Sequence, residues 1–118
     1  MKYYELELNG RTVKFRLTSN DCMTIEKSSG KTITEFFGNL SMTTVITLLR
    51  YMVRSSQNNF DMEDASKLYD ELIDAGYTLE TIISDVIMEA LIVSGFMKKE
   101  DQVKVEKIKE EVKKKAQE

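Results

Sequence analysis

The chain opens with two short stretches in which apolar side chains occupy every second position, over residues 4–8 and 13–17. This alternation is typical of strands with one buried face. Between the stretches lies Asn9-Gly10, a pair that favours a type I′ turn because both of its central residues need positive φ. The sequence therefore predicts a β-hairpin whose apolar face covers a helical layer. The expected pairs are Tyr4 with Phe15, Leu6 with Val13, and Leu8 with Arg11.

Two short helical segments are predicted next. The first covers residues 21–28 and ends at Gly30, and the second, a short helix or a turn, covers residues 32–39. Any of three polar residues could cap the first helix: Ser19, Asn20 and Asp21. The second segment carries two aromatic side chains that are expected to fill the core, Phe36 and Phe37.

Three longer helices follow, each with apolar residues at the three- and four-residue spacing of a helix that has one buried face. They are predicted over residues 41–55, over residues 61–75, and from a cap at Thr78 to a stop near Gly95. The last has the broadest apolar stripe, so it is expected to be the central helix. The stripe of the first consists of Met42, Val45, Ile46, Leu49, Met52 and Val53.

From Lys98 the sequence changes to a run rich in lysine and glutamate. Its apolar residues at helical spacing are few: Val105, Ile108 and Val112. We expect this tail to be helical when bound and frayed when free, so these three residues are a candidate partner-binding surface. A solvated tail without a specific role is the alternative.

These patterns predict an α+β fold that is mainly α. An N-terminal β-hairpin packs on a bundle of about four to five helices, and a charged helical tail follows. The predicted division is a globular domain over residues 1–97 and a tail over residues 98–118.

The charge is distributed unevenly along the 118 residues, whose net charge is −3. Residues 1–54 carry eight basic and five acidic side chains, net +3, and residues 98–118 carry eight and six, net +2. Between them, residues 55–97 carry one basic and nine acidic side chains, net −8. This acidic part argues against nucleic acid as the main partner. It is either a solvated face or a surface that steers a basic partner.

The only cysteine, Cys22, excludes an intrachain disulfide, and no signal peptide is recognisable, so a reducing cytosol is the expected location. Cys22 itself is expected to be a small apolar helix residue. No apolar run approaches the roughly 20 residues of a membrane-spanning helix.

The residues of common catalytic and metal sites are missing. The chain has no histidine, which removes the commonest general base and, with a single cysteine, makes a zinc site implausible. Residues 58–64 lack the ligand pattern and the glycine of a calcium loop. The triplet Gly30-Lys31-Thr32 lacks the first glycine of a phosphate loop, so it is expected to end one helix and start another. The sequence thus predicts a non-enzyme without a cofactor or metal.

A DNA-binding helix is one alternative, because Arg50 and Arg54 lie one turn apart in residues 41–55. That helix is otherwise mostly apolar, and the helix after it is acidic. A helix-turn-helix would need a basic recognition helix after a short turn, so this alternative is disfavoured.

The order of these features resembles the tail assembly chaperones of long, non-contractile-tailed phages and prophages of Gram-positive bacteria. The resemblance covers residues 1–97 and consists of order and spacing without a catalytic signature. After the hairpin, it rests on five short motifs: Leu17-Thr18-Ser19-Asn20-Asp21, Ile25-Glu26-Lys27, Asp70-Glu71-Leu72-Ile73-Asp74-Ala75-Gly76-Tyr77, Val86-Ile87-Met88-Glu89 and Val93-Ser94-Gly95-Phe96.

The resemblance implies a protein of the host cytoplasm that is absent from the mature virion. Such chaperones hold the tape measure protein in solution while the tail tube forms around it. Many exist as a short form, which this chain resembles, and as a frameshifted longer form that recruits the tail tube protein. The resemblance also implies self-association, and it defines no binding residues by motif.

A chaperone for a long helical client would offer an apolar groove between helices, and methionines give such surfaces adaptability. The candidate partner-binding residues of the globular part are Met42, Met52, Met62, Met88, Phe96 and Met97. Core filling is the competing interpretation for most of the methionines. The alternative function is a phage or prophage adaptor or regulator that binds a host protein.

Overall fold

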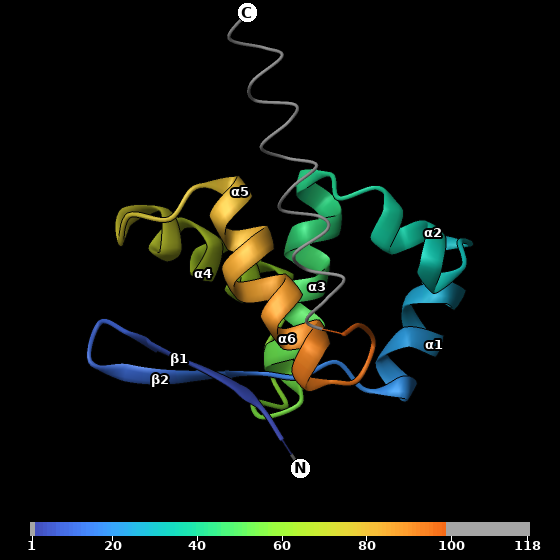
Figure 1. Ribbon diagram of the computed structural model, residues 1–118, viewed down its shortest axis with the longest axis horizontal. Helices are drawn as coiled ribbons and strands as arrows, with labels where there is room; N and C mark the ends of the chain where they lie inside the picture. Colours follow the sequence, from blue (N-terminus) through green and yellow to red (C-terminus); the bar gives the residue numbers. More distant parts are fainter. Residues whose placement is uncertain (1, 99–118) are drawn as a thin grey trace, which may run out of the picture.

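The structure is a computed structural model that describes residues 2–98. It confirms the predicted α+β fold, in which an N-terminal antiparallel hairpin lies against helices (Figure 1). The elements in chain order are β1 (Tyr4–Leu8), β2 (Arg11–Phe15), α1 (Ser19–Ser29), α2 (Ile33–Gly38), α3 (Met42–Arg54), α4 (Met62–Asp74), α5 (Leu79–Ile82), the π-helical segment η1 (Ile83–Ile87) and α6 (Met88–Val93). The predictions for the tail, including Val105, Ile108 and Val112, fall outside the described residues.

The hairpin has the register that its sequence predicts. Asn9 and Gly10 have φ values of 50° and 80°, as a type I′ turn requires. Tyr4 lies opposite Phe15, Leu6 opposite Val13, and Leu8 opposite Arg11. Alternation therefore puts the apolar side chains on one face, where those of Leu8, Val13 and Phe15 are buried.

Two hydrogen bonds from backbone N–H groups join the end of the hairpin to the helices. The Arg16 N–H donates to the Met52 carbonyl of α3 at 3.0 Å, and the Leu17 N–H donates to the Ser94 hydroxyl after α6 at 2.9 Å. The chain therefore leaves β2 already fixed to two helices that lie far apart in sequence.

The start of α1 differs from the prediction. Thr18 is its N-cap, not Ser19, Asn20 or Asp21. The Thr18 hydroxyl accepts from the Asp21 N–H at 3.1 Å, while the Asp21 carboxylate accepts from the Thr18 N–H at 3.0 Å. This reciprocal capping box satisfies two backbone donors, so it wins over a single cap further along. The helix therefore starts at Ser19.

The Gly30-Lys31-Thr32 triplet has the role expected of it. Gly30 ends α1, and its N–H donates to the Glu26 carbonyl at 2.9 Å. Thr32 caps α2 by accepting from the Glu35 N–H. The triplet is thus a junction between two helices.

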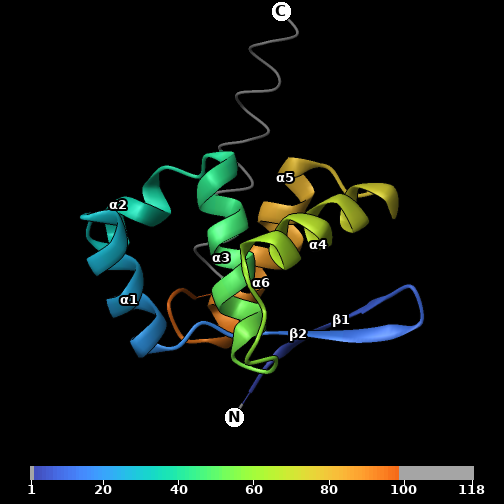
Figure 2. The ribbon, with the colours of Figure 1, turned by 180° about the vertical axis from the view of Figure 1, so that it is seen from behind.

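The central helix is α3, and the prediction that placed the last long helix at the centre is wrong. Figures 1 and 2 show α3 between the α1–α2 pair on one side and α4 on the other. It contacts β2, α4 and η1. Neighbours on several sides bury residues outside its predicted stripe as well, namely Thr44, Leu48 and Tyr51.

The last long helix is also less regular than predicted. Residues 79–93 form a continuous helical path, but its middle is the π-helical segment η1. A π turn of this kind is a single-turn bulge inside an α-helix, and the apolar pattern of the whole segment did not indicate it.

A candidate protein-binding groove

An apolar groove of about 290 Å³ lies where α2 and the segment after it meet the last helix. Its two walls come from residues 34–40 and residues 87–97. The lining residues are Thr34, Phe37, Gly38, Leu40, Ile87, Met88, Leu91, Phe96 and Met97. Its volume is at the lower end of the roughly 300–1,000 Å³ of small-molecule pockets, so it suits a few side chains better than a whole ligand.

The groove has a buried floor and a more accessible rim. Ile87, Met88 and Leu91 form the floor and are buried. Phe96 stands at the rim with 39% of its surface exposed, although it is a large apolar residue. Apolar side chains that fill the groove would remove this surface from water, and each Å² of apolar surface removed contributes about 25 cal/mol of favourable free energy.

A Schellman motif at the end of α6 places Phe96. The Phe96 N–H donates to the Leu91 carbonyl at 2.9 Å, and the Gly95 N–H donates to the Ile92 carbonyl at 3.1 Å. Gly95 has a φ of 87°, which a residue with a side chain rarely adopts. The motif turns the chain back across the groove.

The opposite wall is positioned by contacts of α2. The Glu26 carboxylate of α1 accepts from the Ile33 N–H at 2.9 Å, and the buried Phe36 anchors α2 in the core. The next residue, Phe37, meets Phe96 edge to face, with ring centroids 6.2 Å apart and planes at 75°. This geometry is favourable for aromatic pairs, so the two walls contact each other.

The predicted partner-binding residues are only partly brought together. Met88, Phe96 and Met97 line the groove. Met42 is exposed at the start of α3, and Met62 is half-buried at the start of α4; neither lines the groove.

Met52 does not fit the prediction of a surface contact. Its side chain is fully buried in α3, so in this fold it is a core residue. Its place in the apolar stripe of residues 41–55 already put it on the buried face, so the competing interpretation of core filling holds for Met52, whereas Met42 of the same stripe is exposed where α3 begins.

The sequence analysis missed the α2 wall. Phe37 was expected to fill the core together with Phe36, and Thr34 and Leu40 were not singled out. Two adjacent aromatic residues on a short helix point in different directions, so one of them is expected away from the core. That signal could have indicated Phe37.

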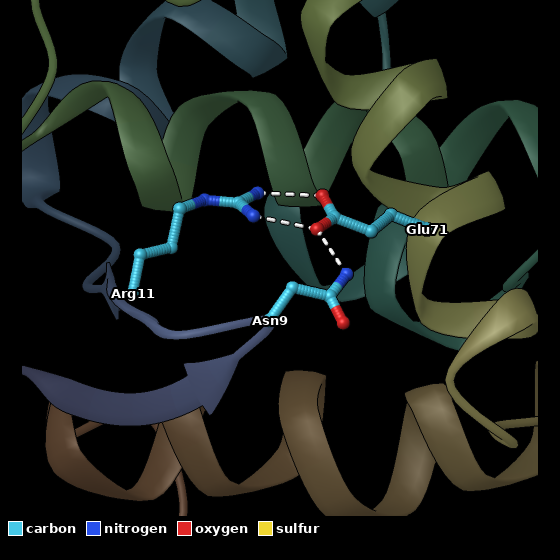
Figure 3. Close-up of polar contacts among 3 residues, drawn as sticks. All are labelled: Asn9, Arg11 and Glu71. Carbon is cyan, nitrogen blue, oxygen red and sulfur yellow. Dashed lines mark hydrogen bonds and ion pairs between the residues drawn. The ribbon is translucent and has the colours of Figure 1, made fainter.

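A second conspicuous contact holds the tip of the hairpin to α4 (Figure 3). Both terminal nitrogens of Arg11 donate to the Glu71 carboxylate at 2.5 Å, and the Asn9 side-chain amide donates to it at 2.7 Å. Hydrogen bonding from Arg11 is the main cause that lowers the pKa of Glu71 to about 2. The carboxylate is fully engaged by the chain's own side chains, so this contact is structural.

Cys22 is shielded by burial, and the carboxylates of the described residues do not gather into a metal site. Burial raises the pKa of the Cys22 thiol to about 11, which leaves it protonated at neutral pH. Among residues 2–98, no three His, Cys, Asp or Glu side chains are grouped to hold a metal ion. Within the same range, no helix is long and apolar enough to cross a membrane.

Comparisons of the chain with known protein families, with curated proteins and with solved structures found no match. The function is therefore argued from the residues and from the groove.

Proposed function

We propose that this chain is a chaperone that holds a helical stretch of a client protein in the groove between residues 34–40 and 87–97. The observation that carries the proposal is the groove itself, an apolar hollow with a large aromatic residue, Phe96, exposed at its rim. An amphipathic client helix would insert apolar side chains at one-turn intervals into such a groove.

The client that we propose is a phage tape measure protein. The support is the resemblance of residues 1–97 to tail assembly chaperones, together with a groove whose size fits side chains of a helix. The acidic part of the chain, residues 55–97, supplies one wall and would attract a client with basic stretches.

Co-expression tests the proposal. A tape measure protein produced with this chain is expected to remain in the soluble fraction, and to aggregate without it. Phe96→Asp places a charge at the rim and should abolish the effect. Met23→Asp is the matched control, because Met23 on α1 is 52% exposed and does not line the groove.

A second pair of variants leaves the aromatic contact of Phe96 intact. Thr34→Arg adds bulk and charge to the exposed rim, and Thr24→Arg makes the same change on the exposed surface of α1. Circular dichroism confirms that each variant folds. Equal solubility of the client with Thr34→Arg and Thr24→Arg would refute the groove as its site.

Equal aggregation of the client with and without the wild-type chain would refute the chaperone function. A specific host partner in a pull-down would then favour the alternative function, an adaptor that binds a host protein.

A further inference from the structure

The chain leaves the domain directly from the groove. Phe96 and Met97 both line it, and Lys98 is the last described residue. The sequence then continues for residues 99–118. Any apolar part of this tail is tethered beside the groove, where a short linker gives an effective concentration on the order of millimolar.

The tail sequence carries one apolar face. Val105, Ile108 and Val112 follow each other at intervals of three and four residues, which places them on one side of a helix. Lysine and glutamate dominate the rest. So short and charged a helix is marginal alone, and it gains stability when its apolar face is buried.

We propose that residues 105–112 dock this face into the groove of their own chain and occupy it until a client arrives. Six residues lie between Lys98 and Val105, a stretch that reaches on the order of 20 Å when extended. That length is enough for the chain to reverse and return to the groove. The complementary charges lie on either side of this segment: residues 98–104 are net +1 and residues 113–118 net +2, against net −8 over residues 55–97, whereas residues 105–112 themselves are net −1.

The groove volume suits this occupant. About 290 Å³ corresponds to about ten water molecules at roughly 30 Å³ each, a space that a few aliphatic side chains fill. The exposed rim of Phe96 is the surface that such an occupant would cover. The docked tail then competes with the client for the groove. This competition rests on the proposed function, whereas the docking of the tail does not.

Methionine methyl NMR on the full chain tests the docking. Ile108→Asp puts a charge in the middle of the apolar face. Val103→Asp adds the same charge to the same tail, two positions before Val105 and so on the opposite side of a helix. We expect Ile108→Asp to shift the methyl signals of Met88 and Met97, and Val103→Asp to leave them unchanged.

Met52, which is buried in α3 and does not line the groove, is the internal reference, and its signal should not move in either variant. Hydrogen exchange of residues 87–97 should also accelerate at least threefold in Ile108→Asp alone. Identical spectra for wild type and both variants would overturn the proposal. Shifts that grow with protein concentration, together with a doubled mass in light scattering, would also overturn it and would assign the groove to a second copy.

Client binding provides the separate test of competition. If the tail occupies the groove nine-tenths of the time, removing it should tighten client binding about tenfold, because apparent affinity scales with the free fraction. We expect Ile108→Asp to bind the client more tightly than the wild type does, and Val103→Asp to bind it with the wild-type affinity. Unchanged client affinity with shifted Met88 and Met97 signals would refute the competition and retain the docking. Absence of any client binding would refute the proposed function alone.

Discussion

Replacing Glu71 with glutamine removes the charge that holds the hairpin tip while nearly preserving the shape of the side chain. Glu71 receives three hydrogen bonds, two from Arg11 and one from Asn9 (Figure 3). Its pKa of about 2, against an ordinary value of 4.5, means that folding favours the ionised form. The wild type should therefore be more stable than Glu71→Gln at neutral pH.

The magnitude follows from the pKa of Glu71. A difference of about 2.5 units at about 1.36 kcal/mol each gives roughly 3.4 kcal/mol as the unscreened limit. The side chain of Arg11 is 51% exposed and that of Glu71 25%, so solvent screens the pair. Measured values for exposed pairs reduce the expectation to about 1 kcal/mol.

The pH dependence has a definite sign. Because folding lowers the pKa of Glu71, its contribution is fully present above about pH 4.5 and is lost as the pH falls toward 2. The difference in unfolding free energy between wild type and Glu71→Gln should therefore be constant from pH 7 to 5 and shrink below pH 4.5. Other carboxylates titrate equally in both proteins and cancel.

Urea denaturation followed by circular dichroism measures this difference. At about 1–3 kcal/mol per molar of urea, 1 kcal/mol moves the midpoint by roughly 0.3–1 M. Glu63→Gln is the control on the same helix, because Glu63 pairs with Lys67 at 3.5 Å and both side chains are more than 70% exposed. It should change stability by no more than about 0.5 kcal/mol. Equal effects of the two substitutions, or a Glu71→Gln effect that persists at pH 2, would refute the reasoning.

Three further predictions concern the core, the turn and the thiol. Leu48→Ala removes a fully buried side chain from α3 and should lower the free energy of unfolding, measured by urea denaturation, by about 2–5 kcal/mol. A loss below about 1 kcal/mol would contradict the central place of α3. Gly10→Ala should cost about 1 kcal/mol by the same measurement, since φ is 80° and no atom lies within 4 Å of the added Cβ; a stabilised variant would contradict this turn. Cys22 should react with a disulfide reagent at pH 8 at least a hundredfold more slowly in the folded protein than in urea, because its thiol is buried and its pKa is about 11; equal rates would contradict its burial.

Local sequence determined the hairpin and most helix ends. Asn9-Gly10 combined with strict alternation allows only one register that keeps the apolar side chains together, and the pairs in the structure match it. Thr78 and Gly95 likewise mark the start and the end of the last long helix at the predicted positions. These features depend on neighbours within a few residues, which is why the sequence alone fixes them.

Tertiary contacts decided the rest. The central place of α3 depends on which elements surround this helix, and apolar spacing carries no such information. The apolar spacing of residues 79–93 likewise did not indicate the π turn within them. The groove illustrates this limit most clearly. Phe96 was a sequence candidate, but its partner Phe37 lies 59 positions earlier. Only the folded chain joins the two walls, because contact between distant segments depends on packing and not on local pattern.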